Sequence, residues 1–255
     1  MVVSFGGGLN STALLVRWAM GGFPPPHKII FADTGGERPE TYTHVRRFDL
    51  WLRVFGFPPI EVTRKGGRPE TLEDYCIRIG MLPSIAYGRK GCSHKFKIEP
   101  QERDTNRWPP ARTIWKYGSK VVKIIGYGAE EQKRISRAKL EDEKYFYRFP
   151  LDEWGMRRED CVREVQSVGL PMPPKSSCFF CPSSTKPEIR NLAPELQTRA
   201  IRIEDAAKLS GRSRTSKGLG RRFAWRDFLA GEEVPEAPVV AGCMFCVDDS
   251  EAPAK

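Results

Sequence analysis

Three consecutive glycines at positions 6–8 are the first feature of the sequence that could do chemistry. Glycine has no Cβ, so a ligand can come close to this stretch of backbone. Asn10, Ser11 and Thr12 follow; these residue types favour the first turn of a helix, where free N–H groups bind anions. The segment has neither the Gly-Lys-Ser/Thr of a Walker A loop nor the Gly-x-Gly-x-x-Gly spacing. It predicts an anion-binding turn, with an ordinary glycine-rich turn as the alternative.

The cysteines are the second such feature. Four of the seven form two Cys-x-x-Cys pairs, Cys178 with Cys181 and Cys243 with Cys246. We expect an intracellular chain, and there this spacing indicates metal or redox chemistry rather than structural disulfides. Thiolates are soft ligands that suit zinc or an iron–sulfur cluster. The remaining cysteines include two within helical patterns, which we expect in the core: Cys76 and Cys161.

The charge balance points to an anionic partner. Lys and Arg total 42 against 32 for Asp and Glu, a net charge of +10, which favours nucleic acid or a nucleotide with several phosphates. One stretch is especially basic and also carries aromatic rings, which can stack on bases. A solvated basic loop is the alternative. The candidate nucleic-acid residues of this stretch are Arg212, Arg214, Arg221, Arg222 and Trp225.

The elements that must position these residues alternate between strand and helix in the first half. Apolar runs predict strands at 2–5, 28–32, 60–63 and 121–125, and helical periodicity predicts helices at 11–20, 38–55 and 71–79. This order predicts an α/β fold, a doubly wound parallel sheet, with ligands at the carboxyl ends of the strands. The second half predicts helices at 156–168, 186–192 and 195–209.

We therefore expect a nucleotide-binding α/β domain over residues 1–150. A smaller helical part over residues 151–255 carries both Cys-x-x-Cys pairs and the basic loop. No run approaches the roughly 18 apolar residues of a membrane span, and the N-terminus has no basic region followed by an apolar one. We expect a cytoplasmic protein with no membrane partner.

The first of these segments resembles a known loop. Residues 4–12 resemble the pyrophosphate-binding loop of the PP-loop ATP pyrophosphatases, with the pattern Ser-Gly-Gly-x-Asp-Ser. They resemble more narrowly the phosphoadenosine phosphosulfate (PAPS) reductase family. Gly7, Gly8 and Ser11 match, whereas Gly6 replaces the first Ser and Asn10 replaces the Asp. Five further segments resemble motifs of that family in the same order: 31–35 with 39–42, 92–100, 126–134, 149–154 and 175–182.

The resemblance covers residues 2 to about 205 and implies an adenine nucleotide alpha hydrolase-like fold. It implies that ATP or PAPS binds, with Mg²⁺ as a possible companion, and that Lys97 and Arg134 add positive charge during catalysis. Asp33 would lie near the nucleoside. The nucleotide-binding residues implied by the resemblance are Ser4, Gly6, Gly7, Gly8, Asn10, Ser11, Thr12, Asp33, Gly126 and Glu131.

Three functions remain open at this point. In the first, ATP adenylylates a substrate for sulfur transfer, with tRNA or DNA as the acceptor and a sulfur donor protein as partner. The second is a PAPS or APS reductase that forms sulfite. Such reductases carry Glu-Cys-Gly-Leu-His near the C-terminus, where residues 241–246 read Ala-Gly-Cys-Met-Phe-Cys, so the first is favoured. The third is a nucleotide-binding module without catalysis.

The resemblance also suggests a metal centre. The iron–sulfur members of the family have Cys-Cys where this chain has Cys92 followed by Ser93. A [4Fe–4S] cluster would be held by Cys92, Cys178 and Cys181, with Cys243 or Cys246 as the fourth ligand. Tetrahedral zinc held by the two Cys-x-x-Cys pairs is the rival interpretation, and free thiols are the third.

Overall fold

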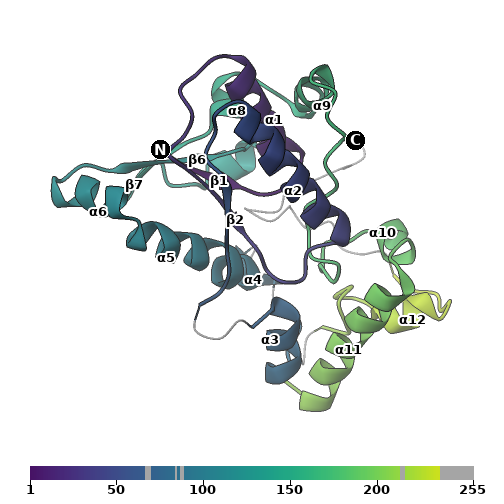
Figure 1. Ribbon diagram of the computed structural model, residues 1–255. Helices are drawn as coiled ribbons and strands as arrows, with labels where there is room; N and C mark the ends of the chain where they lie inside the picture. The colour runs from purple at the N-terminus through teal and green to yellow at the C-terminus, as the bar shows by residue number, and fades with distance from the viewer. Residues whose placement is uncertain (67–69, 84, 87–88, 213–215, 236–255) are drawn as a thin grey trace.

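A parallel five-stranded sheet forms the centre of the molecule (Figure 1). The computed structural model describes residues 1–66, 70–83, 85–86, 89–212 and 216–235. Neighbouring strands of the sheet follow the order β3-β2-β1-β6-β7, and all four pairs are parallel. This architecture confirms the predicted α/β, doubly wound parallel sheet. The strands are β1 (Val2–Phe5), β2 (Lys28–Ala32), β3 (Ile60–Thr63), β6 (Val121–Ile125) and β7 (Tyr145–Arg148).

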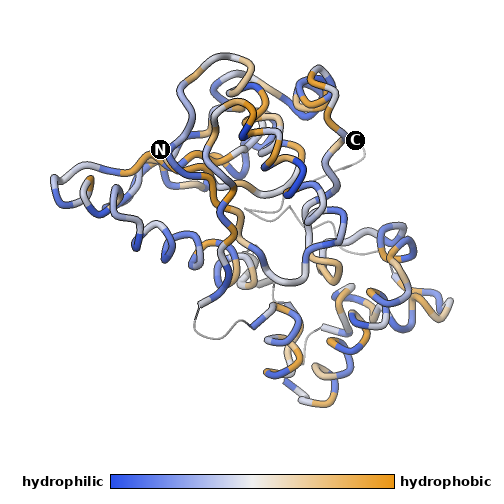
Figure 2. The backbone as a smooth tube through the Cα atoms, in the orientation of Figure 1, coloured by the Kyte–Doolittle hydropathy of each residue, from blue (hydrophilic) through white to orange (hydrophobic). Residues whose placement is uncertain are grey.

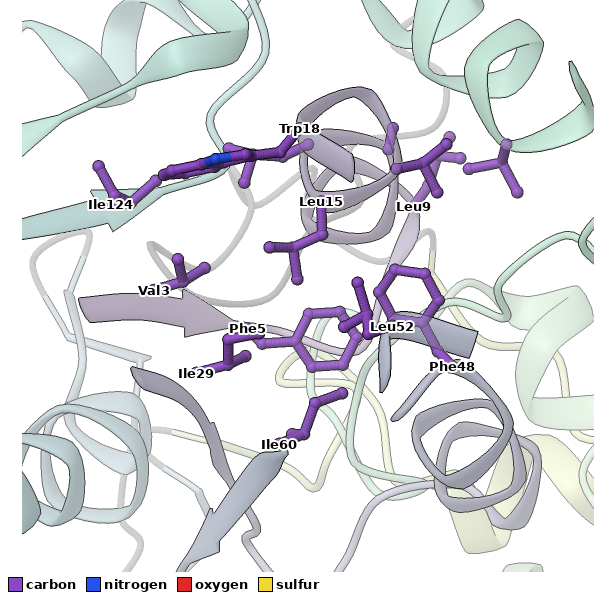
Figure 3. Packing of buried hydrophobic residues seen from close by; sticks show 14 of the residues in the cluster. Val3, Phe5, Leu9, Leu15, Trp18, Ile29, Phe48, Leu52, Ile60 and Ile124 are labelled. Atoms are coloured by element: carbon purple, nitrogen blue, oxygen red, sulfur yellow. The ribbon is translucent and has the colours of Figure 1, made fainter. Parts of the chain in front are cut away.

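Alternation along the strands gives the sheet two covered faces. Val3 and Phe5 of β1 pack on one face against α1 (Leu9–Met20), α2 (Pro39–Val54) and α9 (Arg158–Ser167), as Figure 3 shows for part of this core. Val2 points to the other face, where it packs in a smaller cluster with Val121 and Ala111. Two helices cover this second face: α5 (Glu99–Arg107) and α6 (Pro109–Lys116).

The strand order reverses between β1 and β6. The chain runs from β1 outward through β2 to β3 and returns to the other side of β1 as β6 and β7. Crossovers on the two sides of β1 therefore leave in opposite directions, and a crevice opens beyond the carboxyl ends of β1 and β6. The glycine segment 6–8 follows β1, and Gly126 follows β6, at this crevice.

A second hydrophobic cluster lies to one side of the sheet (Figure 1). It joins α3 (Leu72–Ile79) to α10 (Lys186–Arg190), α11 (Pro194–Ser210) and α12 (Trp225–Leu229). Phe179 and Phe180, between the two cysteines of the first Cys-x-x-Cys pair, are fully buried in it. Cys76 belongs to this cluster and Cys161 to the sheet core, so the expectation that both are core residues is confirmed.

Several elements escape the sequence patterns. Helices α5 and α6 each carry Pro in their first turn. Figure 2 shows that α5 is mostly hydrophilic, so α5 has no clear apolar period, and α6 has only eight residues. Strand β7, with the sequence Tyr-Phe-Tyr-Arg, was not predicted either. The other unpredicted elements are short: β4 (Ile85–Ala86), β5 (Arg89–Lys90), α4 (Gly91–Ser93), the π-helix η1 (His94–Ile98), α7 (Gln132–Ile135), α8 (Pro150–Glu153) and α12.

The helices on either side of the expected domain boundary at residue 150 pack in two groups. Met156, Cys161 and Val165 belong to the core of the sheet, and α9 packs along α1. The contacts of the described residues thus group α9 with the sheet, whereas α3 packs on α11. None of the helices in the described ranges is long and apolar enough to cross a membrane.

One buried carboxylate connects separate segments of the second hydrophobic cluster. Glu204 of α11 accepts hydrogen bonds from the backbone amides of Leu219 (2.6 Å), Trp225 (2.8 Å) and Arg226 (3.1 Å). Two separate segments are thus fixed to one side chain. Hydrogen bonds to a charged acceptor are stronger than neutral ones, and donors left buried without an acceptor are costly.

We expect Glu204→Ala to lower the free energy of unfolding by about 3 kcal/mol, because three amides lose their acceptor. Urea unfolding followed by circular dichroism measures the change. The control is Glu195→Ala in the exposed first turn of the same helix, with an expected loss of roughly 0.5 kcal/mol. Equal losses in the two variants would contradict the role assigned to Glu204.

Candidate functional site

The glycine segment forms a tight connection between β1 and α1. Gly8 is the N-cap of α1, and Gly7 has a φ of +74°. A Cβ at Gly7 would lie 3.1 Å from the ring of Phe31 and 3.3 Å from the methyl group of Thr41. Both the left-handed backbone and the close contact with β2 and α2 therefore require glycine at this position.

Hydroxyl groups of the first helical turn hold the segment in place. The amide of Gly6 donates to Ser11 Oγ (3.2 Å), and the hydroxyls of Ser11 and Thr12 donate to the carbonyl of Gly8 (3.2 and 2.9 Å). No side chain caps the helix, and within the described residues the amides of Gly7 and Gly8 have no hydrogen-bond partner. These amides, at the positive end of the α1 dipole, can bind an anion.

A cleft opens at the point where the strand order reverses. It encloses about 440 Å³ when its open mouth is included. Ser4 and Gln101, whose side chains are joined by a hydrogen bond of 2.6 Å, line its wall. Gly126 lines it from β6, and a Cβ there would lie 3.2 Å from the amide nitrogen of Ser11. The cleft therefore adjoins the first turn of α1.

The turn after β6 closes over the helix N-terminus. Glu131 Oε2 accepts hydrogen bonds from Asn10 Nδ2 (3.0 Å) and from the amide of Gly128 (2.9 Å). Glu131 Oε1 pairs with Arg134, whose guanidinium lies 5.4 Å from the ring centre of Tyr127. The structure thus brings Asn10 together with Glu131 and Arg134, which the resemblance had placed in a different motif from Asn10. Asn10 Oδ1 is buried without a partner.

Lys97 reaches the same cleft from the other side. It lies in the π-helix η1, an irregularity found frequently at functional sites. Its ammonium group pairs with Glu37 Oε1 at 2.9 Å, and both side chains are almost fully buried. Lys97 lines the cleft together with Ser4 and Gly6. The side chain of Lys97 thus lines the cleft, and a buried carboxylate fixes the position of its ammonium group.

Asp33 stabilises the turn that follows β2. Its Oδ1 accepts hydrogen bonds from the amide of Gly35 and from the hydroxyl of Tyr42, both at 2.7 Å. Its Oδ2 accepts from Arg64 Nε at 2.8 Å. Burial, followed by the neighbouring Asp33, raises the pKa of Tyr42, so Tyr42 remains a donor to this carboxylate. Asp33 therefore shapes the loop after β2.

Three cysteines line a second cavity next to Lys97. Cys92, Cys178 and Cys181 lie in its wall together with Thr34. Cys178 Sγ is 3.2 Å from Thr34 Oγ1, and burial raises the pKa of the Cys178 thiol. Within the described residues no group of three or more His, Cys, Asp or Glu side chains is arranged to hold a metal ion. Cys243 and Cys246 lie outside the described residues.

The basic stretch is partly occupied by contacts within the chain. Arg212 donates to the carbonyl of Ile79 at 2.9 Å. The ring of Trp225 is fully buried, so it offers no face for stacking on a base, contrary to the expectation from sequence. Arg221 and Arg222 lie in the turn before α12, where Arg221 has a φ of +66°. Arg214 lies outside the described residues.

The structure adds residues that the sequence patterns did not single out. Ser176 Oγ donates to the carbonyl of Gly6, so the segment before Cys178 lies directly on the glycine loop. Arg38 precedes the Pro39-Glu40-Thr41 motif, and its Nε and Nη2 atoms are buried without a hydrogen-bond partner. The available signal was the place of Ser176 within the recognised segment 175–182 and of Arg38 directly before residues 39–42.

Comparisons with known proteins find likeness among solved structures. No protein-family model matches the sequence, and no curated protein matches it. Among solved structures, the phosphate complex of phosphoadenylyl-sulfate (PAPS) reductase from Candida auris is similar, with a TM-score of 0.44 and 16% sequence identity. The similar region covers 68% of this chain and 74% of that chain. The α/β assignment rests on the strand order described above.

His44 supports the glycine loop from α2. Its Nε2 lies 2.9 Å from Thr12 Oγ1, the same hydroxyl that donates to the carbonyl of Gly8. Its ring stacks on Phe48 with centroids 5.6 Å apart. Burial lowers the pKa of His44 from 6.5 to about 4. Between these two values the unfolded chain takes up a proton that the folded chain excludes.

We expect this histidine to make stability fall as the pH decreases from about 6.5 to about 4. At 1.36 kcal/mol per pKa unit, the full contribution is roughly 3 kcal/mol. The measurement is the free energy of unfolding in urea at pH 7 and pH 5. In His44→Phe the stability should fall less between these two values than in the native protein. His27→Gln, at an exposed position, should retain the native pH dependence. A similar decrease in both variants would exclude His44 as its source.

Proposed function

We propose that this chain binds an adenine nucleotide with its phosphate chain on residues 6–8 and the N-terminus of α1, and that it transfers the adenylyl group to a substrate. The observation that carries the proposal is the pair of unpartnered amides of Gly7 and Gly8 at the strand-order reversal. Phosphate groups bind such helix N-termini through amide hydrogen bonds and the helix dipole. The cleft lined by Ser4, Gly6 and Gly126 adjoins these amides.

The reaction follows from this placement. A substrate oxygen attacks the α-phosphorus of ATP, the bond from that phosphorus to the bridging oxygen breaks, and pyrophosphate leaves. The amides of the glycine loop stabilise the charge that develops on the leaving group. Lys97 and Arg134, each oriented by a carboxylate, add positive charge at the cleft. Mg²⁺ would accompany ATP as its usual counterion.

The acceptor is proposed from the resemblance and from charge. The sulfur-transfer branch of the family suggests that adenylylation prepares a nucleic acid, tRNA or DNA, for a sulfur donor protein. The net charge of +10 supports a polyanionic acceptor. Arg221 and Arg222 remain candidates for that contact. The cytoplasmic location expected from the sequence is part of this proposal.

A sulfite-forming reductase is the second candidate, and the cavity with three cysteines favours it. Such a reaction needs a thiolate that attacks the sulfur of PAPS. Burial raises the pKa of Cys178, which keeps this thiol protonated and disfavours it as the nucleophile. Cys181 is partly exposed and is the better candidate in the described chain. A nucleotide-binding module without turnover is the third.

We expect purified protein with ATP and an acceptor to release AMP or an adenylylated product together with pyrophosphate. Gly7→Ala should lower nucleotide affinity at least tenfold, because the added methyl meets Phe31 and Thr41. The control is Gly56→Ala, which has the same φ of +74° but nothing within 4 Å. Calorimetry measures binding, and chromatography measures the products.

The outcomes separate the three candidates. Sulfite from PAPS would replace the proposed reaction with the reductase, and binding without products would favour the module. A chain that binds no adenine nucleotide would contradict all three. An equal loss of affinity in Gly56→Ala would show that backbone strain, not the contact at the loop, is responsible.

The metal centre stays a prediction. Three thiols around one cavity suit an iron–sulfur cluster chemically, but the described residues alone do not form a coordination set, so no step above uses a metal. We expect anaerobically purified protein to be brown and to contain iron and acid-labile sulfide. Cys181→Ser should lose both, and Cys161→Ala, in the sheet core, should keep them. Colourless protein with stoichiometric zinc would support the zinc alternative instead.

A further inference from the structure

Two segments that are distant in sequence pair beside the glycine loop. Glu37 and Cys178 form an antiparallel bridge, and the amide of Phe179 donates to the carbonyl of Gly36 at 2.9 Å. Successive side chains along extended backbone alternate between faces, and opposite residues of a pair share a face. Glu37 and Cys178 therefore face the cavity of Thr34 and Lys97. Arg38 and Ser177, the next pair, face away from it.

The face with Arg38 and Ser177 carries polar atoms that lack partners. Arg38 Nε and Nη2 and Ser177 Oγ are buried without a hydrogen bond, and Ser177 is only 3% exposed. Thr41, one turn into α2, is fully buried and its hydroxyl is also unpartnered. Unpaired buried polar groups cost free energy, and each such group in a folded protein calls for a reason. A bound ligand would supply the missing partners.

The charges in this region leave one cation uncompensated. Lys97 pairs with Glu37 and Lys175 pairs with Glu188, both at 2.9 Å. Arg38 has no ion pair within the described chain. Burial acts to raise the pKa of Glu188, but the amide of Thr185 and the cations Lys175 and Arg38 lower it overall. Arg38 thus lies close enough to act on Glu188 without forming a contact with it.

The face with Arg38 and Ser177 lies beside the glycine loop. Ser176, next to Ser177, donates to the carbonyl of Gly6. The methyl group of Thr41 lies 3.3 Å from the place of a Cβ on Gly7. Arg38 and Ser177 are therefore carried by segments that contact the loop from the side of α2. Lys97 instead lines the cleft with Gly126, and Arg134 pairs with Glu131 in the turn after β6.

We propose that Arg38 and Ser177, with the hydroxyl of Thr41, bind a tetrahedral oxyanion, a phosphoryl or sulfo group, beside the glycine loop. A guanidinium presents two parallel donors that match such a group, and hydroxyls complete its hydrogen bonds. The oxyanion belongs either to the terminal phosphate of the nucleotide or to a second substrate. This assignment to the reacting molecules rests on the proposed function.

The test titrates sulfate and, separately, AMP and ATP into the native protein and variants by calorimetry. We expect R38A to weaken sulfate binding at least tenfold, S177A to weaken it severalfold, and R38K to restore it in part. AMP binding should stay within twofold of native in all three. The matched control is R47A, which removes the same charge from an exposed position of α2.

The ATP titration distinguishes the two sources of the oxyanion. If the terminal phosphate occupies the pocket, R38A weakens ATP binding while AMP binding is unchanged. If a second substrate occupies it, R38A leaves both nucleotides unchanged, and sulfate binds to protein already saturated with ATP. An equal effect of R38A and R47A on sulfate would overturn the proposal, because net charge alone would then explain it.

A stability measurement separates binding from a structural role. Two buried guanidinium nitrogens without hydrogen-bond partners are unfavourable, so R38M should raise the melting temperature of the protein without ligand while it removes sulfate binding. A lower melting temperature in R38M would overturn the proposal. If native protein bound no adenine nucleotide but bound sulfate through Arg38, the proposed function would fail and the oxyanion pocket would stand.

Discussion

The close approach of three chain segments to the backbone of residues 6–8 is the constraint on which the site depends. The first turn of α1 approaches Gly126 so closely that a Cβ there would lie 3.2 Å from the amide of Ser11. On the other side, a Cβ added to Gly7 would lie only 3.1–3.3 Å from the side chains of Phe31, Thr41 and Val45. A side chain at either glycine would separate the loop from β2, α2 or β6. The absence of a side chain at Gly7 and at Gly126 therefore determines the orientation of the backbone amides of the glycine loop.

Around this loop the chain keeps polar groups whose hydrogen bonds are incomplete. Asn10 Oδ1, Thr41 Oγ1 and Ser177 Oγ are all buried without partners. The cations near the loop differ in their ion pairs. Lys97 and Arg134 each pair with a carboxylate, which fixes their orientation, whereas Arg38 has no ion pair among the described residues. Binding sites are commonly less stable than the best alternative sequence would make them.

The sequence predicts those parts of the fold that local pattern determines. Strands β1, β2, β3 and β6 are short apolar or β-branched runs, so their positions agree with prediction. Helix α5 has charged residues through most of its length, and no periodic signal marks it. The pairing of residues 36–38 with 177–179 depends on tertiary structure alone, so the neighbourhood of Arg38 and Ser177 could not be predicted. The resemblance supplied the motifs of Asn10 and Glu131, but not their hydrogen bond.

The segment 176–180 ties the loop to the second hydrophobic cluster. At its beginning, Ser176 contacts the carbonyl of Gly6; at its end, the ring of Phe180 lies where a Cβ on Gly36 would be only 2.6 Å away. Phe179 and Phe180 pack among the helices that Glu204 organises. Because these aromatic rings are fully buried, the serines before them have little freedom to move independently. The second hydrophobic cluster therefore acts as the rigid support that holds Ser176 against the glycine loop. Through Phe96 of η1 it also supports the helix whose Lys97 lines the cleft.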